Sequence, residues 1–431
     1  MLTASLGSIK LQPTVSRLNA LALVYGNFMT IGALVFVSIG QAYVLNANLG
    51  VPLTEQGVIS GDLALWSELV IVLTVGFFGV IADRTSRRSV FVFGLSMLAL
   101  SYVLYPLAGA VTDLVVYRAL NAIGVAATTC LLTVITHDYA REESRGKLLA
   151  ACAIGGGLGA LLITGVFGRL PVFFQQQGLA IVLAGQYMHW LVAALIGVSA
   201  VFLLRTLKSG TPIHRQERPS FGALIRSGVG EARNPRIALS YASAFVARGD
   251  LMIVGTFLVL WGTVAGREQG MSTPQAVAAG TMLFVVTQIA TLVWVPVLGV
   301  MMDRLNRVTA VIVGSALGAV AFLSTAFIDN PLDRAYLPVF ALIGIGQISC
   351  LLTSQALIGQ EAPAQKRGAV VGAFSWCGAI GIMAFAAVGG RLFDSFSPAA
   401  PFMLVGAGTA AVMLAGIVVR LKSPGRMPAR S

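Results

Sequence analysis

Four ionisable residues lie within long apolar segments, where charged side chains are costly and usually functional. Two are the acids Glu68 and Asp250, and two are the arginines Arg118 and Arg248. A carboxylate in a low-dielectric pocket can load and release a proton near neutral pH, as proton coupling requires. A guanidinium can hold an anionic group through two parallel hydrogen bonds. This set predicts a site that exchanges protons and binds a small solute, with an anionic or zwitterionic solute favoured.

Both acids are expected far from the cytoplasmic ends of their segments. At a rise of about 1.5 Å per residue, Glu68 lies roughly 22 Å from Asp83, and Asp250 roughly 21 Å from Arg236. Arg248 is two residues from Asp250, so a helix places the two side chains on nearly opposite faces. Arg248 therefore either holds an anionic group of the solute or pairs with a carboxylate of a neighbouring helix.

Other polar residues are expected nearer the outer ends of their segments. Arg118 enters its segment about two turns from the outer surface, so it either snorkels to that surface or reaches a cavity. Asp62 is expected at a solvated mouth and His189 at the membrane interface. Further side chains that could line a cavity, although each alone is more often a packing residue, are Tyr25, Trp66, Trp261, Thr291, Gln347 and Trp376.

The segments that carry these residues are predicted to be membrane-spanning helices. The chain has 431 residues, of which 57% are hydrophobic and 11% charged, a balance outside that of soluble domains. A run of about 20 apolar residues crosses a bilayer, and only a helix satisfies its own backbone there. We predict an all-α membrane protein with twelve such helices, over approximately 18–44, 57–82, 89–109, 112–136, 147–168, 185–206, 237–264, 275–302, 308–328, 336–358, 368–391 and 400–421.

The net charge of +12 is interpreted as a topology signal rather than as a nucleic-acid surface. Most of the 29 Lys and Arg residues fall in the tails and the even-numbered loops, so both termini are predicted to be cytoplasmic. The first apolar run is too long for a signal-peptide core and is expected to be a retained helix. All four cysteines fall inside predicted helices, where neither disulfides nor a zinc site is expected. We expect no metal and no cofactor.

The chain contains an internal repeat. The pattern Gly-x-x-x-Asp-Arg-x-x-Arg ends one apolar run in each half, 220 positions apart. Its residues are Gly79, Asp83, Arg84 and Arg87 in the first copy, and Gly299, Asp303, Arg304 and Arg307 in the second. Repeated apolar segments are typical of secondary transporters. The repeat predicts two pseudo-symmetric six-helix bundles, residues 1–208 and 237–431, joined by a cytoplasmic loop over 209–236.

The repeat also pairs polar residues of the two halves. An offset of 220 pairs Glu68 with Gln288, and an offset of 223 pairs Asn27 with Asp250. Each pair has one carboxylate and one amide, so all four side chains are expected to point toward the space between the halves. Gly-Arg-Leu, at 168–170 and at 390–392, closes the fifth and the eleventh predicted helix.

The repeated acids are expected to latch the cytoplasmic side shut, because a carboxylate is stabilised at the positive N-terminus of a helix. The alternative is that these charges only set the topology. The expected contacts are Asp83 with the helix that begins at Arg367, Asp303 with the helix that begins at Arg145, and Arg87 with Asp138.

With these motifs the chain resembles the major facilitator superfamily over nearly its whole length. GVIADRTSRR at 79–88 is similar to the family's loop motif, with Ser86 where the family usually has Gly. VVYRALNAIGVAA at 115–127 is similar to its fourth-helix motif, including Arg118 and Gly124. The fifth helix lacks the Gly-Pro pair of the drug-proton antiporters. The resemblance implies two bundles that rock about a central cavity.

We therefore predict a secondary active transporter of a small organic solute, coupled to protons through Asp250 or Glu68. It is expected to be a monomer in a bacterial inner membrane. Sodium coupling and proton-driven efflux of amphiphilic compounds remain alternatives. A membrane enzyme or a transporter-derived sensor is a further alternative, but the chain has no phosphate-binding loop, and its three histidines fall on different predicted elements.

Overall fold

The computed structural model describes residues 5–6, 9–141, 144–209, 227–363 and 366–425. Only the backbone is described at residues 5, 6, 80, 83, 133, 137, 145, 146, 303, 367 and 368. Within these ranges, twelve helices are long and apolar enough to cross a membrane, which confirms the predicted all-α fold and the predicted number of spans. Most of the central loop predicted over 209–236 lies outside the described residues.

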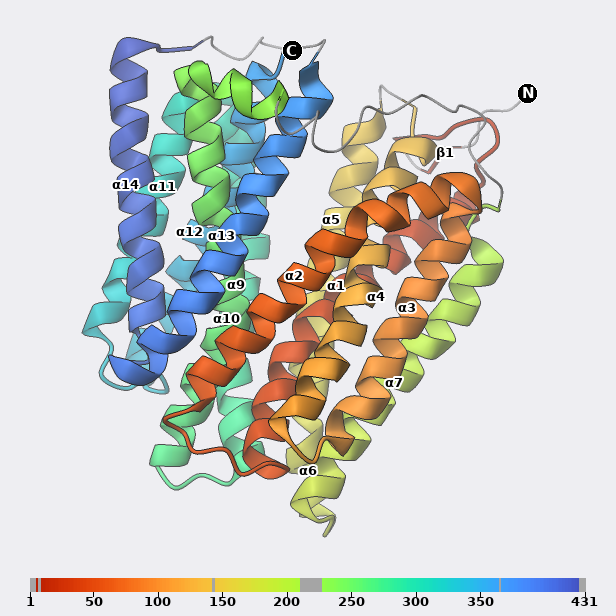
Figure 1. Ribbon diagram of the computed structural model, residues 1–431, viewed down its shortest axis with the longest axis vertical. Coiled ribbons are helices and arrows are strands. Elements are labelled where there is room, and N and C mark those ends of the chain that lie inside the picture. Colours follow the sequence, from red (N-terminus) through yellow and green to blue (C-terminus); the bar gives the residue numbers. More distant parts are fainter. Residues whose placement is uncertain (1–4, 7–8, 142–143, 210–226, 364–365, 426–431) are drawn as a thin grey trace. The chain divides into compact units, whose positions relative to one another are not determined.

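The residues divide by their contacts into two units, and Figure 1 labels the helices of both. Unit 1 comprises Met1–Val51, Trp66–Gln216 and Met271–Thr281, and unit 2 comprises Pro52–Leu65, Glu217–Gly270 and Met282–Ser431. Two helices, α2 (Gln56–Arg84) and α10 (Thr273–Arg304), have residues in both units. The units therefore differ from the halves of the sequence repeat in two short stretches, each of which includes the start of a helix.

The remaining elements of unit 1 are β1 (Ser5–Leu6), β2 (Ile9–Lys10), α1 (Arg17–Ala47), α3 (Arg87–Leu104), η1 (Tyr105–Leu107), α4 (Val111–Tyr139), α5 (Arg145–Phe167), α6 (Leu170–Gln176) and α7 (Ile181–Thr206). Helix α1 packs mainly on α5, and α3 packs on α4 and α7. Small residues allow the closest approach, since a Cβ on Gly159 would lie 1.9 Å from the carbonyl oxygen of Phe28.

The segment before α1 is fixed to the end of α4. The strands β1 and β2 pair antiparallel, and Leu11, fully buried, forms a bridge with Ala140. Helix α1 then begins with a capping box in which Ser16 and Asn19 satisfy each other's backbone amides. Local polar side chains thus define where this first membrane helix starts.

The remaining elements of unit 2 are η3 (Glu231–Arg233), α9 (Pro235–Glu268), α11 (Arg307–Leu323), η4 (Ser324–Phe327), η5 (Arg334–Tyr336), α12 (Leu337–Glu361), α13 (Arg367–Ser395) and α14 (Ala400–Lys422). Helix α9 contacts α12, α13 and α14, and α11 packs between α12 and α14. The same terminal signals recur here, because Asn234 caps α9 ahead of Pro235, and Asn306 caps α11.

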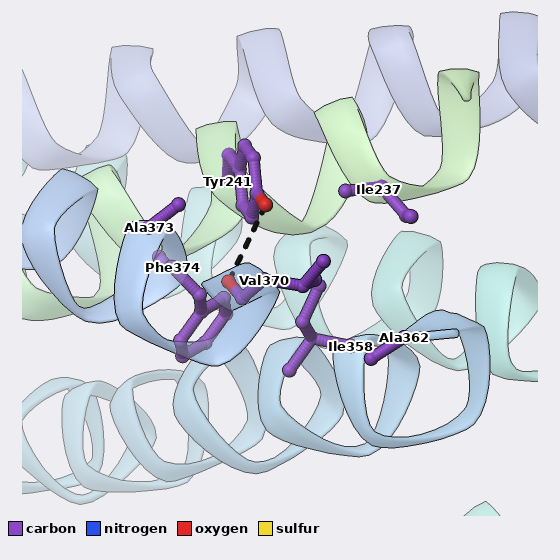
Figure 2. Close-up of a cluster of buried hydrophobic side chains, with 8 residues drawn as sticks. Ile237, Tyr241, Ile358, Ala362, Val370, Ala373 and Phe374 are labelled. Atoms are coloured by element: carbon purple, nitrogen blue, oxygen red, sulfur yellow. Dashed lines mark hydrogen bonds between the residues drawn. The ribbon is translucent and has the colours of Figure 1, made fainter. Parts of the chain in front are cut away.

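A buried cluster of side chains joins α9, α12 and α13 within unit 2 (Figure 2). Tyr241 belongs to the α9 side of the cluster, and its hydroxyl contacts the carbonyl oxygens of Gly228 at 2.9 Å and of Val370 at 3.3 Å. Ile358 and Phe374 contribute apolar side chains from α12 and α13. The cluster fixes the first turns of α13 against α9.

Candidate functional site

The acid predicted in the seventh spanning helix lies in the interior of unit 2. Asp250 of α9 is fully buried, and neither of its carboxylate oxygens accepts a hydrogen bond from a described residue. Gln347 of α12 lies beside it and donates from Nε2 to the backbone carbonyl of Asp250 at 3.4 Å. Cys350, also on α12, is close enough to interact with it electrostatically. The carboxyl group is therefore held between α9 and α12.

Arg248 lies on a different side of α9, as the helical spacing predicts. Its aliphatic stem packs over Gly378 of α13, where an added Cβ would lie 2.6 Å from the Arg248 Cγ. The guanidinium still acts electrostatically on Asp250. A positive group and an acid that accepts no hydrogen bond from the described residues thus lie near each other in one bundle, with the acid on the α12 side.

The expectation that Asp250 points into the space between the halves stays a prediction. The rise per residue gives the position of a residue along its helix, whereas the neighbouring helices decide which face is buried. Asn27 is half-buried, and its amide donates to the Leu23 carbonyl of its own helix at 3.0 Å. Gln288 is half-buried too. The role predicted for the two symmetric pairs remains a prediction.

Unit 1 has its own polar group around the predicted arginine of α4. Arg118 is only 8% exposed, and its Nε donates to the Ser67 hydroxyl of α2 at 3.1 Å. Glu68, half-buried, is the next residue on α2. The snorkelling alternative for Arg118 is wrong, because the side chain lies inside the unit and binds a neighbouring helix.

His189 is not the interfacial residue that its position predicted. It is fully buried in α7, with Nδ1 2.8 Å from the Gly185 carbonyl, and its ring stacks on Tyr105. Gly40 of α1 leaves room for the ring, since a Cβ there would lie 2.5 Å from Nε2. The sequence missed this because the glycine that accommodates the ring lies on a different helix.

Most of the other cavity candidates have partners within their own units. Tyr25 binds Ser199 at 2.7 Å, Thr291 donates to the carbonyl of Gly344, and Trp261 packs on Phe340 and Phe402. Trp66 and Trp376 are 53% and 38% exposed.

Part of the expected cytoplasmic latch is described. Arg87 and Asp138 form the expected ion pair, and Arg307 donates to the carbonyl oxygen of Met302, which closes the turn between α10 and α11. An added Cβ on Gly79 would meet only Cys130 at 3.7 Å, so packing among the described residues does not require that glycine. The side chains of Asp83, Asp303, Arg145 and Arg367 lie outside the described part of the chain, and their latch role stays a prediction.

A carboxylate that the sequence analysis did not single out lies at the start of α2. Asp394, near the end of α13, accepts hydrogen bonds from the backbone amides of Gly57 at 2.8 Å and Val58 at 2.6 Å. Both contacts lie within unit 2. Beside them, Arg391 binds Asp62 at 3.3 Å. The available signal was the pair Gly57 and Gly61, whose spacing is typical of close helix packing.

Comparison with known proteins agrees with this architecture. The model of the Major Facilitator Superfamily matches residues 20–386 and 282–430, and the chain belongs to that family. It is therefore a transporter by family and fold, and the resemblance found in the sequence is confirmed.

Three similar proteins illustrate the range of the family. Magnetosome protein MamH of Paramagnetospirillum magneticum is 28% identical over 91% of this chain and 90% of its own length. Magnetosome protein MamZ of the same organism is 26% identical over 90% of this chain, which spans 60% of that longer protein. The crystal structure of a mutant of the nucleoside transporter NupG superposes with a TM-score of 0.74 at 14% identity, covering 93% of this chain and 99% of NupG. This last likeness concerns the fold alone.

Proposed function

We propose that the chain is a proton-coupled secondary transporter in which Asp250 is the proton-binding group. The observation that carries this proposal is the fully buried carboxyl group of Asp250, whose oxygens accept no hydrogen bond from a described residue. An ionised carboxylate in that state is costly, and a bound proton removes the cost. Release of the proton would draw Gln347 or Arg248 toward the carboxylate, which links proton occupancy to the packing of α9 on α12.

The proposed substrate is a small organic solute, with an anionic or zwitterionic solute favoured by Arg118 and Arg248. Transport would follow a rocking of the two repeat halves. Efflux of amphiphilic compounds is the second candidate, and the exposed rings of Trp66 and Trp376 favour it, because flat aromatic faces suit such compounds. Sodium is the alternative coupling ion.

The proposed location is a bacterial inner membrane, with both termini cytoplasmic and the protein monomeric. The names of two similar proteins offer the magnetosome membrane as an alternative. Fluorescent fusions at either terminus, combined with membrane fractionation, would separate the two locations and test the orientation.

The function is tested in liposomes. A panel of metabolites and drugs is first screened for compounds that raise the melting temperature of the purified protein, because native-state ligands do so. For each hit, solute accumulation and the pH of the lumen are followed under an imposed proton gradient, and again under a sodium gradient. Transported solute should be recovered chemically unchanged, which separates transport from enzymatic conversion.

Three variants locate the coupling group. Asp250→Asn should abolish proton-driven accumulation while solute exchange continues, because exchange requires binding without net proton release. The control Asp329→Asn, which changes an exposed acid outside the spanning helices, should behave as wild type. If Asp250→Asn accumulates solute normally and Glu68→Gln does not, the coupling site is Glu68. Normal accumulation by both variants would refute proton coupling at either residue.

A further inference from the structure

Helix α2 is capped at its start by a side chain of another helix. Glu55 occupies the N-cap position, since its carbonyl accepts the first helical bond from the Ile59 amide at 3.2 Å. In most helices the side chain at this position would bind the second or third amide of the helix. Here those amides belong to Gly57 and Val58, and both donate to Asp394.

Asp394 therefore serves as the N-cap side chain of α2, although it lies 337 positions from Gly57 in the sequence. A carboxylate suits this place because it offers two acceptor oxygens and is attracted to the positive end of the helix. Each oxygen binds one amide, at 2.8 and 2.6 Å. An asparagine would keep one acceptor, replace the other with a donor, and remove the charge.

The backbones of α2 and α13 are in direct contact at this place. A Cβ on Gly61 would lie 2.5 Å from the Ala386 carbonyl oxygen, and a Cβ on Gly390 would lie 2.5 Å from the Gly57 carbonyl oxygen. Any side chain at these glycines would force the helices apart, so the cap and the close approach depend on each other. The Arg391–Asp62 pair lies at the edge, with side chains 58% and 40% exposed.

We propose that Asp394 is a gating residue that holds the predicted outer end of α2 against α13 and must release it in each transport cycle. This inference rests on the proposed alternating access, because α2 belongs by sequence to one repeat half and α13 to the other. The first turns of α2 group with unit 2 and the remainder with unit 1. When α2 moves with its own half, the amides of Gly57 and Val58 lose their acceptor. The free energy of the cap is thus tied to the position of α13.

Thiol labelling tests the gate without any substrate. Reporter cysteines are placed, one at a time, at Ser60, which is 1% exposed in α2, and at Ala276, which is fully buried in the first turn of α10. The background lacks the four native cysteines, and a membrane-impermeant maleimide is added from outside. Asp394→Asn should raise the labelling rate at Ser60→Cys about fivefold, the factor that corresponds to a lost helix cap. The rate at Ala276→Cys should not change.

Two controls make the result decisive. Asp394→Glu keeps both acceptor oxygens and should restore much of the slow labelling, whereas a merely misfolded variant would label quickly at both reporters. Val172→Asn, at the equivalent position of the other repeat, should leave both rates unchanged. Unchanged labelling at Ser60→Cys in Asp394→Asn would overturn the proposal, and so would an equal rise at both reporters. Because no solute is involved, a failed transport assay leaves this result standing, and a failed gate leaves the transport result standing.

Discussion

The starts of α2 and α10 occupy equivalent places in the two repeats but are stabilised differently. At the start of α2, Asp394 of α13 binds the first amides of the helix. At the start of α10, the cap is local, since the Gln275 side chain accepts from the Ser272 amide at 3.2 Å and the Ala276 amide donates to the Ser272 carbonyl at 2.9 Å. One helix start depends on a distant helix, and the other depends on its own neighbours.

The residues packed around the two helix starts also differ. The glycines of α2, Gly57 and Gly61, are replaced in α10 by Val277 and Thr281, and the position equivalent to Asp394 is Val172. Within unit 1 a hollow of about 380 Å³ lies beside Val172, with Gln275 and Ala278 on its α10 side. The duplicated fold thus keeps both helices but has a carboxylate cap and a backbone-to-backbone approach at the start of α2, whereas at the start of α10 an added Cβ on Gly168 would lie 2.8 Å from the Thr281 side chain.

Exchanging the packing residues of the two helix starts should have the largest effect on the free energy of unfolding. Gly61→Thr gives α2 the residue of α10, and its Cβ would lie 2.5 Å from the Ala386 carbonyl oxygen. Overpacking of this kind should cost about 3 kcal/mol or separate the two helices. The reverse trimming, Thr281→Ala, should cost about 1 kcal/mol. Thermal unfolding in detergent, with labelling at Ser60→Cys, measures both, and equal costs would remove the distinction between the two starts.

Giving α2 a local cap should separate helix stability from gating. Glu55→Ser places a hydroxyl at the N-cap position, which should recover about 1 kcal/mol of what Asp394→Asn loses. The labelling rate at Ser60→Cys should stay high in the double variant, because the new cap does not reach α13. Recovery of slow labelling together with stability would show that Asp394 only caps the helix and does not hold it.

Removing the local cap of α10 should have a smaller, confined effect. Gln275→Ala loses one hydrogen bond to the Ser272 amide and should lower the free energy of unfolding by about 0.5–1 kcal/mol. Labelling at Ala276→Cys should rise by no more than the factor that corresponds to this loss of free energy, because only the first turn of α10 is destabilised. A rise at Ser60→Cys in this variant would mean that the two starts are coupled, contrary to the comparison.

Breaking the exposed ion pair between Arg391 and Asp62 should have the smallest effect on stability and on labelling at Ser60→Cys. Arg391→Gln or Asp62→Asn removes a contact between side chains that are 58% and 40% exposed, and such pairs contribute about 0–1 kcal/mol. Labelling at Ser60→Cys should change less than about twofold, and salt should reduce the difference further. A change as large as that of Asp394→Asn would move the gate from the buried carboxylate to the surface pair.

The sequence predicted the features that depend on local pattern, namely the spans and the family. It missed the contacts between side chains of helices that are distant in the chain. Apolar run lengths located the twelve spans, and the repeated loop motif identified the family. Asp250 lies in a spanning helix as predicted, but its neighbours Gln347 and Cys350 are about a hundred positions away, and no periodicity assigns them. A carboxylate at a helix start, which was predicted at Asp83, is observed at Asp394, whereas the Asp83 side chain lies outside the described part of the chain.

Hydrogen exchange of the backbone amides tests the account of the two helix starts most directly. The amides of Gly57 and Val58 are compared in wild type and Asp394→Asn, and the first turn of α10 is compared in wild type and Val172→Asn. We predict that exchange at Gly57 and Val58 rises about fivefold in Asp394→Asn, as a lost cap of about 1 kcal/mol implies, while the start of α10 is unchanged in Val172→Asn. Unchanged exchange at Gly57 and Val58, or an equal rise at the start of α10, would contradict it.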